Sequence, residues 1–213
     1  MDLVVATRNA HKTREIQHLL GPEFWVRDLG GHPEMSEICE SGTSFEENAK
    51  LKALAASRQL SALVIADDSG LEVDALGGAP GVYSARYAGR NATDRDRIGK
   101  LLRELARVRS TDDQRRARFR CVVALARNDN LLATFEGIVE GRIADEARGD
   151  SGFGYDPIFI PEGLEQTFGE LPSKVKNTIS HRAKAIRALA VKIRQLYPDA
   201  KVLEEAEEPG PFE

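Results

Sequence analysis

The stretch from Ile65 to Gly89 constrains the fold of this chain more than any other. An apolar run at residues 63–66 is typical of a buried strand, and it leads directly into the adjacent acids Asp67 and Asp68. We therefore expect a strand that ends in two carboxylates at the rim of a sheet, where small ligands bind in α/β proteins. The glycines that follow let the backbone approach a ligand closely. A strand end closed by a polar turn, with no ligand, would fit the same pattern.

The size and charge of the chain limit its function. With 213 residues, 41% of them hydrophobic and 30% charged, the chain has the composition of one globular domain with a sizeable core. Its formal net charge of −4 gives no electrostatic reason to expect binding to nucleic acid or to an anionic membrane. An anionic ligand must then be met by local cations or by a metal.

The cellular location follows from what the sequence lacks. Cys39 and Cys121 are the two cysteines, and they show no CxxC spacing, so we expect neither a disulfide framework nor structural zinc. The apolar run near the N-terminus is too short for a signal peptide, and no window approaches a transmembrane span. We therefore expect a cytoplasmic protein.

The N-terminal segment has the pattern of a phosphate-binding turn. An apolar strand at residues 3–6 is followed by a polar turn and then by an amphipathic helix. The N-terminus of that helix offers free N–H groups, and Lys12 adds a full positive charge. The turn has fewer glycines than a Walker loop. Its residues are Thr7, Arg8, Asn9, Ala10, His11 and Lys12.

Strands and helices alternate early in the chain, and a hairpin follows later. Ser44 begins a helix that ends at Gln59 and carries Lys50 and Lys52 on different faces, either of which alone we expect to be solvated. We expect further strands at residues 24–27, 117–125, 131–139 and 157–160, and a helix that begins at Thr93. Ser180 begins the last helix, whose core stripe we expect to be Ile186, Leu189, Ala190, Ile193 and Leu196. This order predicts an α/β fold with a mixed sheet in a single domain, 1–197, followed by an acidic, disordered tail, 198–213.

The polar residues suggest magnesium and a polyphosphate. Carboxylates without histidine or cysteine partners favour Mg²⁺, with Mn²⁺ as a substitute, and Glu40, Asp67 and Asp68 are such a set. Lysines from separate segments fit a polyphosphate that lies across the site. Ser69 is suited to hydrogen-bond a phosphate or sugar oxygen.

Two later segments are open to two interpretations. Phe153 and Tyr155 are either core aromatics or a surface for a nucleobase, and the glycines on each side of Phe153 favour the second interpretation. His181 and Arg182 begin a helix, where such residues are usually exposed. An arginine beside an aromatic ring would also suit a planar heterocycle with acceptor edges.

Five segments together are specific enough to indicate a family. In order and spacing they resemble the inosine triphosphate pyrophosphatase family, the Ham1-type non-standard purine nucleoside triphosphatases. The likeness covers nearly all of Leu3–Leu196. The segments are TRNAHKTREI, SFEENAKLKA, IADDSGLEVDALGGAPGVYSARYAG, GFGYDPIF and KNTISHRAKAI.

The resemblance implies a role for each matching residue. It implies that Thr7–Lys12 hold the triphosphate, that Glu40 and Asp68 bind Mg²⁺, and that Asp68 is the proton acceptor. Lys52 would lie near the metal and phosphates, and Ser69 would contact substrate. Arg8 departs from the small residue expected after Thr7, so it either narrows the phosphate turn or points to solvent. The nucleoside end would be lined by Phe153, Gly154, Tyr155, Asp156, Lys176, His181 and Arg182.

The resemblance also implies the activity and the architecture. The expected reaction is Mg²⁺-dependent hydrolysis of ITP, dITP and XTP to the monophosphate and pyrophosphate, which removes deaminated purines. The expected fold is an elongated mixed sheet flanked by helices, in two lobes with the nucleotide between them, and the expected assembly is a homodimer. Two alternatives stay open. One is an aspartyl-phosphate-type phosphatase, although the first strand lacks the usual Asp-x-Asp. The other is a nucleotide-sensing module without turnover.

Overall fold

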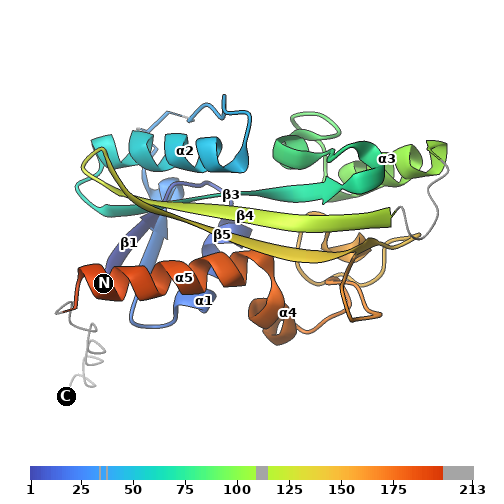
Figure 1. The fold of residues 1–213 in the computed structure, drawn as a ribbon. Helices are drawn as coiled ribbons and strands as arrows, with labels where there is room; N and C mark the ends of the chain where they lie inside the picture. Colours follow the sequence, from blue (N-terminus) through green and yellow to red (C-terminus); the bar gives the residue numbers. More distant parts are fainter. Residues whose placement is uncertain (34, 37, 109–114, 199–213) are drawn as a thin grey trace, which may run out of the picture.

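A computed structural model describes residues 1–33, 35–36, 38–108 and 115–198 of the chain (Figure 1). Strands and α-helices alternate up to β3, and the long hairpin β4–β5 follows α3. The elements are β1 (Asp2–Val5), α1 (Ala10–Leu20), β2 (Trp25–Asp28), η1 (Leu29–Gly31), α2 (Phe45–Gln59), β3 (Leu63–Val73), η2 (Asp74–Leu76), η3 (Gly81–Arg86), α3 (Asp94–Arg107), β4 (Arg116–Arg127), β5 (Asn130–Ile143), η5 (Asp156–Ile158), β6 (Phe159–Pro161), α4 (Ser173–Ile179) and α5 (His181–Leu196).

The described strands form one six-stranded sheet with the order β2-β1-β3-β4-β5-β6. β1 pairs in parallel with β2 and β3, because a helix connects each strand to the next. β3 to β6 pair antiparallel, and β4 and β5 are joined by a tight turn in which Asn128 and Asp129 have positive φ. The predicted mixed sheet is therefore confirmed.

Helices cover both faces of this elongated sheet (Figure 1). On one face, α1 and α5 pack against residues such as Leu3, Ile65 and Val123. On the opposite face, α2 packs against Val4, Ala66 and their neighbours on β4. Residues of β3 therefore alternate between two cores, as expected for a strand buried on both faces.

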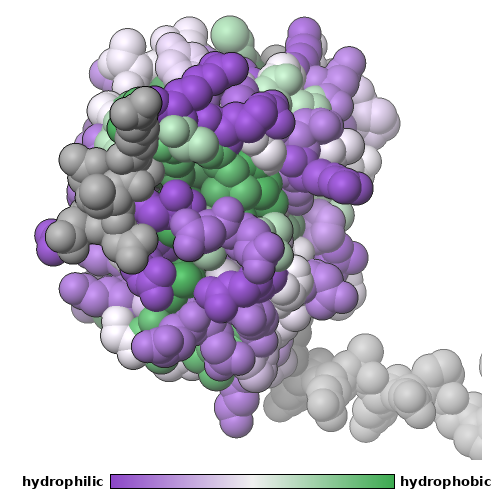
Figure 2. All heavy atoms as spheres, turned by 90° about the vertical axis from the view of Figure 1, so that its right-hand side faces the viewer, coloured by the Kyte–Doolittle hydropathy of each residue, from purple (hydrophilic) through white to green (hydrophobic). Residues whose placement is uncertain are grey.

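A third core lies toward the other end of the long strands. Leu71 and Val73 of β3 pack there with α3, β6 and three phenylalanines of the C-terminal half. Figure 2 views the molecule from that end and shows mostly hydrophilic side chains around a smaller hydrophobic area. The division into two lobes with the nucleotide between them stays a prediction.

Four caps and turns form as predicted. Ser44 accepts a hydrogen bond from the Glu47 N–H, and Ser180 accepts one from the Ala183 N–H. Thr93 and Asp96 form a reciprocal capping box at the start of α3. The hairpin turn at residues 128–130 lies where the sequence placed it.

Several expectations are wrong. β3 does not end at Asp67 and Asp68; it continues to Val73, because β4 remains its partner after β1 has ended. Leu196 is 40% exposed and is not part of the core stripe, since α5 ends there. Helix α4 was not predicted at all.

Residues 199–213, which make up nearly all of the predicted acidic tail, lie outside the described residues. None of the described helices combines the length and the hydrophobicity that a membrane crossing requires.

Candidate active site

The site begins where β1 ends beside the middle of β3. The last register pair of these strands is Val5 with Ile65, and the Ala6 N–H still donates to Ile65 O over 2.7 Å. The chain then turns into α1, where the Asn9 side chain accepts hydrogen bonds from the N–H groups of His11 and Lys12. Lys12 thereby reaches the Asp67 carboxylate. The positive end of α1 and the acids of β3 meet at this point.

A cavity of about 440 Å³ opens at this junction and brings together most of the predicted residues. Thr7, Arg8, Ala10 and Lys52 lie outside its lining. Its lining also includes Gly70, Val82, Ser84, Ala85, Asp94, Arg97 and Phe119, which were not predicted. The predicted residues in the lining are Asn9, His11, Lys12, Glu40, Asp68, Ser69, Phe153, Gly154, Tyr155, Asp156, Lys176, His181 and Arg182.

At one end of the cavity, Lys52 joins the two carboxylates that the resemblance assigns to a metal. Its Nζ lies 2.7 Å from Glu40 Oε1 and 2.9 Å from Asp68 Oδ1, and it also donates to Asp67 O. Lys52 is 8% exposed, so the expectation that it is solvated is wrong. A buried ammonium between two acids keeps their oxygens close together.

The donors at this end fit a magnesium ion. Asp68 Oδ2 is buried and has no hydrogen-bond partner among the described residues, which leaves a carboxylate oxygen free for a ligand. Mg²⁺ commonly binds through one or two carboxylates together with water and substrate phosphates. The described residues hold no group of three or more histidines, cysteines or acids that would form a complete protein cage. Glu40 and Asp68 therefore suit Mg²⁺ better than a metal that needs an all-protein site.

The two carboxylates differ in acidity. Burial raises the pKa of Asp68 above its ordinary value, although Lys52 and Lys12 act in the opposite direction. Burial also acts to raise the pKa of Glu40, but Lys52 and Arg86 together hold that pKa below its ordinary value. The surroundings of Asp68 thus favour its protonated form and those of Glu40 favour the charged form, which makes Asp68 the candidate to accept a proton.

Asp67 lies in different surroundings from Asp68, because its side chain is on the opposite face of the sheet. Its carboxylate accepts hydrogen bonds from Arg182 Nε over 2.9 Å and from Cys121 Sγ over 3.0 Å. Burial would raise the pKa of Asp67, but Arg182 and Lys12 hold that pKa well below its usual range. Asp67 is therefore a buried, permanently charged partner for these cations. The expectation that both acids lie together at a rim is wrong.

Arg182 is also buried, and each of its three nitrogens donates to a side chain. It is 2% exposed, and it donates to Asp67, to Glu15 and to Ser69 Oγ, the last over 2.9 Å. The expectation that residues 181 and 182 are exposed is wrong for both, because α5 begins under the sheet and not at the surface. Arg182 lines the cavity as one member of an ionic network.

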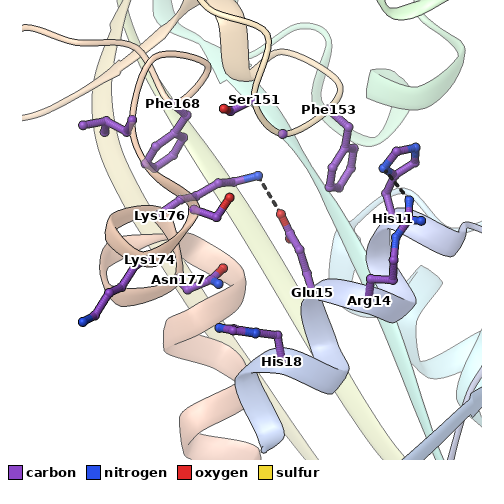
Figure 3. A pocket seen from close by; sticks show the side chains of 13 residues that line it. His11, Arg14, Glu15, His18, Ser151, Phe153, Phe168, Lys174, Lys176 and Asn177 are labelled. Atoms are coloured by element: carbon purple, nitrogen blue, oxygen red, sulfur yellow. Dashed lines mark hydrogen bonds and ion pairs between the residues drawn. The ribbon is translucent and has the colours of Figure 1, made fainter.

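Glu15 connects that network to the other end of the cavity. Lys176 Nζ lies 2.7 Å from Glu15 Oε1 and 2.6 Å from Asp156 Oδ2. Figure 3 shows Glu15 pointing from α1 toward Lys176, beside a second cavity of about 610 Å³. The two cavities have His11, Phe153 and Lys176 in common.

The aromatic residues of the glycine-rich loop separate into two roles. Tyr155 is buried in the third core, and its hydroxyl donates to Ser84 O over 3.0 Å. Phe153 is half-buried in the cavity wall, and its ring stacks on His11 with centroids 5.5 Å apart. Gly152 has φ of +79°, and a Cβ there would lie 2.1 Å from Asp156 Oδ2, so only glycine fits. The glycines therefore present Phe153 to the cavity, and Tyr155 is a core residue.

His181 lies deep in the cavity wall against Phe119. The two rings are nearly parallel, with centroids 4.7 Å apart. Burial, together with Arg182 and Lys176, lowers the pKa of His181 well below its ordinary value, so its imidazole is neutral. Its Nδ1 is buried without a hydrogen-bond partner in the part of the chain that the structure describes. A neutral imidazole with a free nitrogen is suited to hydrogen-bond a heterocycle.

Sequence reasoning missed Glu15, Arg86 and Asp94. Glu15 follows Lys12 by one helical turn, so the spacing on α1 placed it on the same face. Arg86 Nη1 lies 3.0 Å from Glu40 Oε2, and Asp94 Oδ2 accepts the Gly154 N–H over 2.7 Å. No local pattern marks the last two contacts, because each joins segments that are 46 or 60 residues apart.

Comparison with known proteins gives consistent matches. A family model described as the Ham1 family matches residues 3–192. A dITP/XTP pyrophosphatase of Bacillus licheniformis is 46% identical over 198 residues, which cover 91% of this chain and 98% of the relative. The dITP/XTP pyrophosphatase of Bacillus subtilis is 47% identical over 190 residues, which cover 89% and 95%.

Solved structures show the same similarity. A HAM1 protein from Coxiella burnetii superposes with a TM-score of 0.82 at 42% identity, covering 92% of this chain and 99% of that one. A nucleoside-triphosphatase, or dITP/XTP pyrophosphatase, from Mycobacterium abscessus superposes with a TM-score of 0.72 at 40% identity, covering 89% and 98%.

Proposed function

This chain belongs to the Ham1 family, and from that premise we propose that it hydrolyses non-standard purine nucleoside triphosphates such as dITP, ITP and XTP. The products would be the nucleoside monophosphate and pyrophosphate. The observation that carries the proposal is a cavity that holds Lys12, the buried Oδ2 of Asp68 and a neutral imidazole, where this Oδ2 and His181 Nδ1 have no hydrogen-bond partner among the described residues. One end of this cavity is suited to phosphates and the other to a heterocycle.

The residues at the phosphate end would supply charge and a base. Lys12 lies at the N-terminus of α1, where free N–H groups and the helix dipole also favour anions. Lys52 would hold Asp68 in place, and Asp68 would accept the proton of the water that attacks the α-phosphorus. The electrons of the broken P–O bond would leave with pyrophosphate, whose charge the lysines would offset.

Magnesium would be held by Glu40 and Asp68. When bound, it would supply a positive charge that offsets the charge of the phosphate oxygens. The free Oδ2 of Asp68 and the all-oxygen donor set support this assignment.

The nucleoside end would read the purine through groups with free donors or acceptors. Within the described part of the chain, His181 Nδ1 has no partner, and two of the five N–H donors of Arg182 remain beyond the contacts to Asp67, Glu15 and Ser69. A buried group that hydrogen-bonds the 6-oxo position strongly disfavours adenine, because adenine has a donor there. We also propose, from the family resemblance, that the enzyme is a homodimer, and from the sequence that it works in the cytoplasm.

Product analysis tests the proposal against both alternatives. The protein would be incubated with ITP, dITP, XTP, GTP and ATP in the presence of Mg²⁺, with Asp68→Asn as the control. We expect pyrophosphate, mainly from the first three nucleotides and not in excess chelator. Orthophosphate would instead indicate an aspartyl-phosphate-type phosphatase, and binding without any product would indicate a sensing module.

A further inference from the structure

Arg8 lies in the phosphate turn, but its side chain points away from the cavity. Its Nη1 donates to Leu29 O over 2.8 Å, and its Nη2 donates to Met35 O over 2.6 Å and to His32 O over 3.3 Å. The guanidinium therefore neither narrows the phosphate turn nor extends freely into solvent. It contacts three main-chain carbonyls of a single segment.

That segment leads to Glu40. Leu29 belongs to η1, Met35 is buried, and Glu40 follows them in the chain. The main chain after Glu40 is held separately, because Gly42 N donates to Asn48 Oδ1 over 2.8 Å and Thr43 N donates to Glu47 Oε2 over 2.7 Å. Glu40 thus lies between two points that are fixed by side chains of other elements.

The contacts of Arg8 differ in kind from those of Lys52 and Arg86. Lys52 and Arg86 bind the Glu40 carboxylate itself, so a metal at that carboxylate would compete with them. Among the described residues, the contacts of Arg8 are to carbonyl oxygens of the main chain, so a metal at the Glu40 carboxylate would not compete for them. A planar guanidinium can donate in several directions at once, whereas the single ammonium of a lysine covers fewer separated acceptors.

We propose that Arg8 is a positioning residue for Glu40, which joins the phosphate turn to the segment that carries a metal ligand. The inference rests on the proposed function, in which Glu40 binds Mg²⁺. Without Arg8, the main chain at Leu29, His32 and Met35 would lose these contacts, and fixing Glu40 for the metal would use part of the binding free energy. Residues that hold a metal ligand from outside typically change metal affinity by about 10–100-fold.

The experiment measures binding of Mn²⁺ to the nucleotide-free protein by electron paramagnetic resonance, which is independent of turnover. We expect Arg8→Ala to weaken Mn²⁺ binding about tenfold and Arg8→Lys to weaken it less. Arg27→Ala is the matched control, since it removes the same charge from an exposed arginine that pairs with Asp2, and it should leave Mn²⁺ affinity unchanged.

A double-mutant comparison with Glu40→Gln shows whether Arg8 acts through Glu40. If it does, Arg8→Ala combined with Glu40→Gln binds Mn²⁺ as weakly as Glu40→Gln alone. Additive losses, or unchanged affinity in Arg8→Ala, would overturn the inference while the wild-type protein still binds Mn²⁺. A wild-type protein that binds no Mn²⁺ would overturn the metal assignment as well, so the two failures are distinguishable.

Discussion

Asp67 and Asp68 are neighbours in sequence, but they direct their carboxylates to opposite faces of β3. Asp67 lies on the α5 side with Arg182 and Cys121, and Asp68 lies on the α2 side with Lys52. The alternation of side chains along a strand makes this separation unavoidable. The pair therefore divides into a structural acid, whose charge is fully paired, and an acid with a free oxygen in the cavity.

Replacement of Asp68 by Asn should reduce turnover at least about a hundredfold, the usual scale for loss of a general base. The free energy of unfolding should change little, because asparagine keeps an oxygen that can accept from Lys52, and Lys52 keeps Glu40 as its counter-charge together with Asp67 O. Single-turnover rates and urea denaturation measure the two effects. A rate close to that of the wild type would show that Asp68 is not the proton acceptor.

The same substitution at the neighbouring acid, Asp67→Asn, should lower the free energy of unfolding. It would leave Arg182 and Lys12 without their main counter-charge, and breaking a buried ion pair in this way typically costs about 3–5 kcal/mol of unfolding free energy. The same urea denaturation measures it. If Asp67→Asn unfolds at the same urea concentration as the wild type, the network around Asp67 contributes little to stability.

Replacement of Arg182 by Ala should destabilise the protein by a similar amount, about 3–5 kcal/mol, since it removes the buried guanidinium from two ion pairs and leaves Asp67 with Lys12 and Glu15 with Lys176. Arg194→Ala is the control on the same helix. Arg194 pairs with Glu23 at the surface, and loss of an exposed pair typically costs less than about 1 kcal/mol. Equal effects of the two changes on the denaturation midpoint would contradict this assignment.

Local patterns in the sequence were sufficient for most elements. The capping residues Ser44, Thr93 and Ser180 marked three helix starts correctly, because a cap depends on hydrogen bonds within a few residues. Helix α4 was not predicted because it is short and because Pro172, the residue before it, offers no capping side chain. The end of β3 was misplaced because two acids in a row usually stop a strand; here cations from α1, α2 and α5 offset their charge.

The sequence predicted most residues of the site, but not which of them form ion pairs with one another. Lys12, Lys52 and Lys176 were all identified, yet their partners are set by contacts across 55, 16 and 20 residues of sequence. The carbonyls that Arg8 contacts also lie far from it in sequence, so no local pattern predicts these contacts. Resemblance to a family indicates which residues matter, and only the fold shows which of them share an ion pair.

The two cysteines should differ sharply in reactivity. Cys39 is exposed, whereas Cys121 is fully buried and donates to Asp67. Burial, together with the Asp67 charge, raises the pKa of the Cys121 thiol well above its ordinary value, so it does not form the reactive thiolate. A thiol reagent should therefore label one cysteine rapidly in the folded protein and both in urea. Rapid labelling of two thiols in the folded state would show that the core around Asp67 opens readily.

Stability should fall in mild acid because of His181. In the folded protein its pKa is lowered well below the ordinary value by burial and by the charges of Arg182, Lys176 and Lys12, which Asp67 only partly offsets. In the unfolded chain the imidazole binds a proton below about pH 6.5. The unfolded state thus binds more protons than the folded state in this range, so the contribution is fully present above pH 6.5 and is lost as the pH falls.

The pH dependence of the free energy of unfolding shows whether His181 is responsible for this loss. One proton bound only by the unfolded chain lowers the free energy of unfolding by about 1.4 kcal/mol per pH unit. Phenylalanine at position 181 keeps a ring that can stack on Phe119 but cannot be protonated. Urea denaturation between pH 7.5 and 5.5 should therefore give a flatter pH dependence for His181→Phe than for the wild type, whereas His18→Gln, at an exposed site, should follow the wild type. Parallel curves for all three proteins would mean that His181 is protonated in the folded state and that its imidazole is not the neutral group proposed to meet the purine.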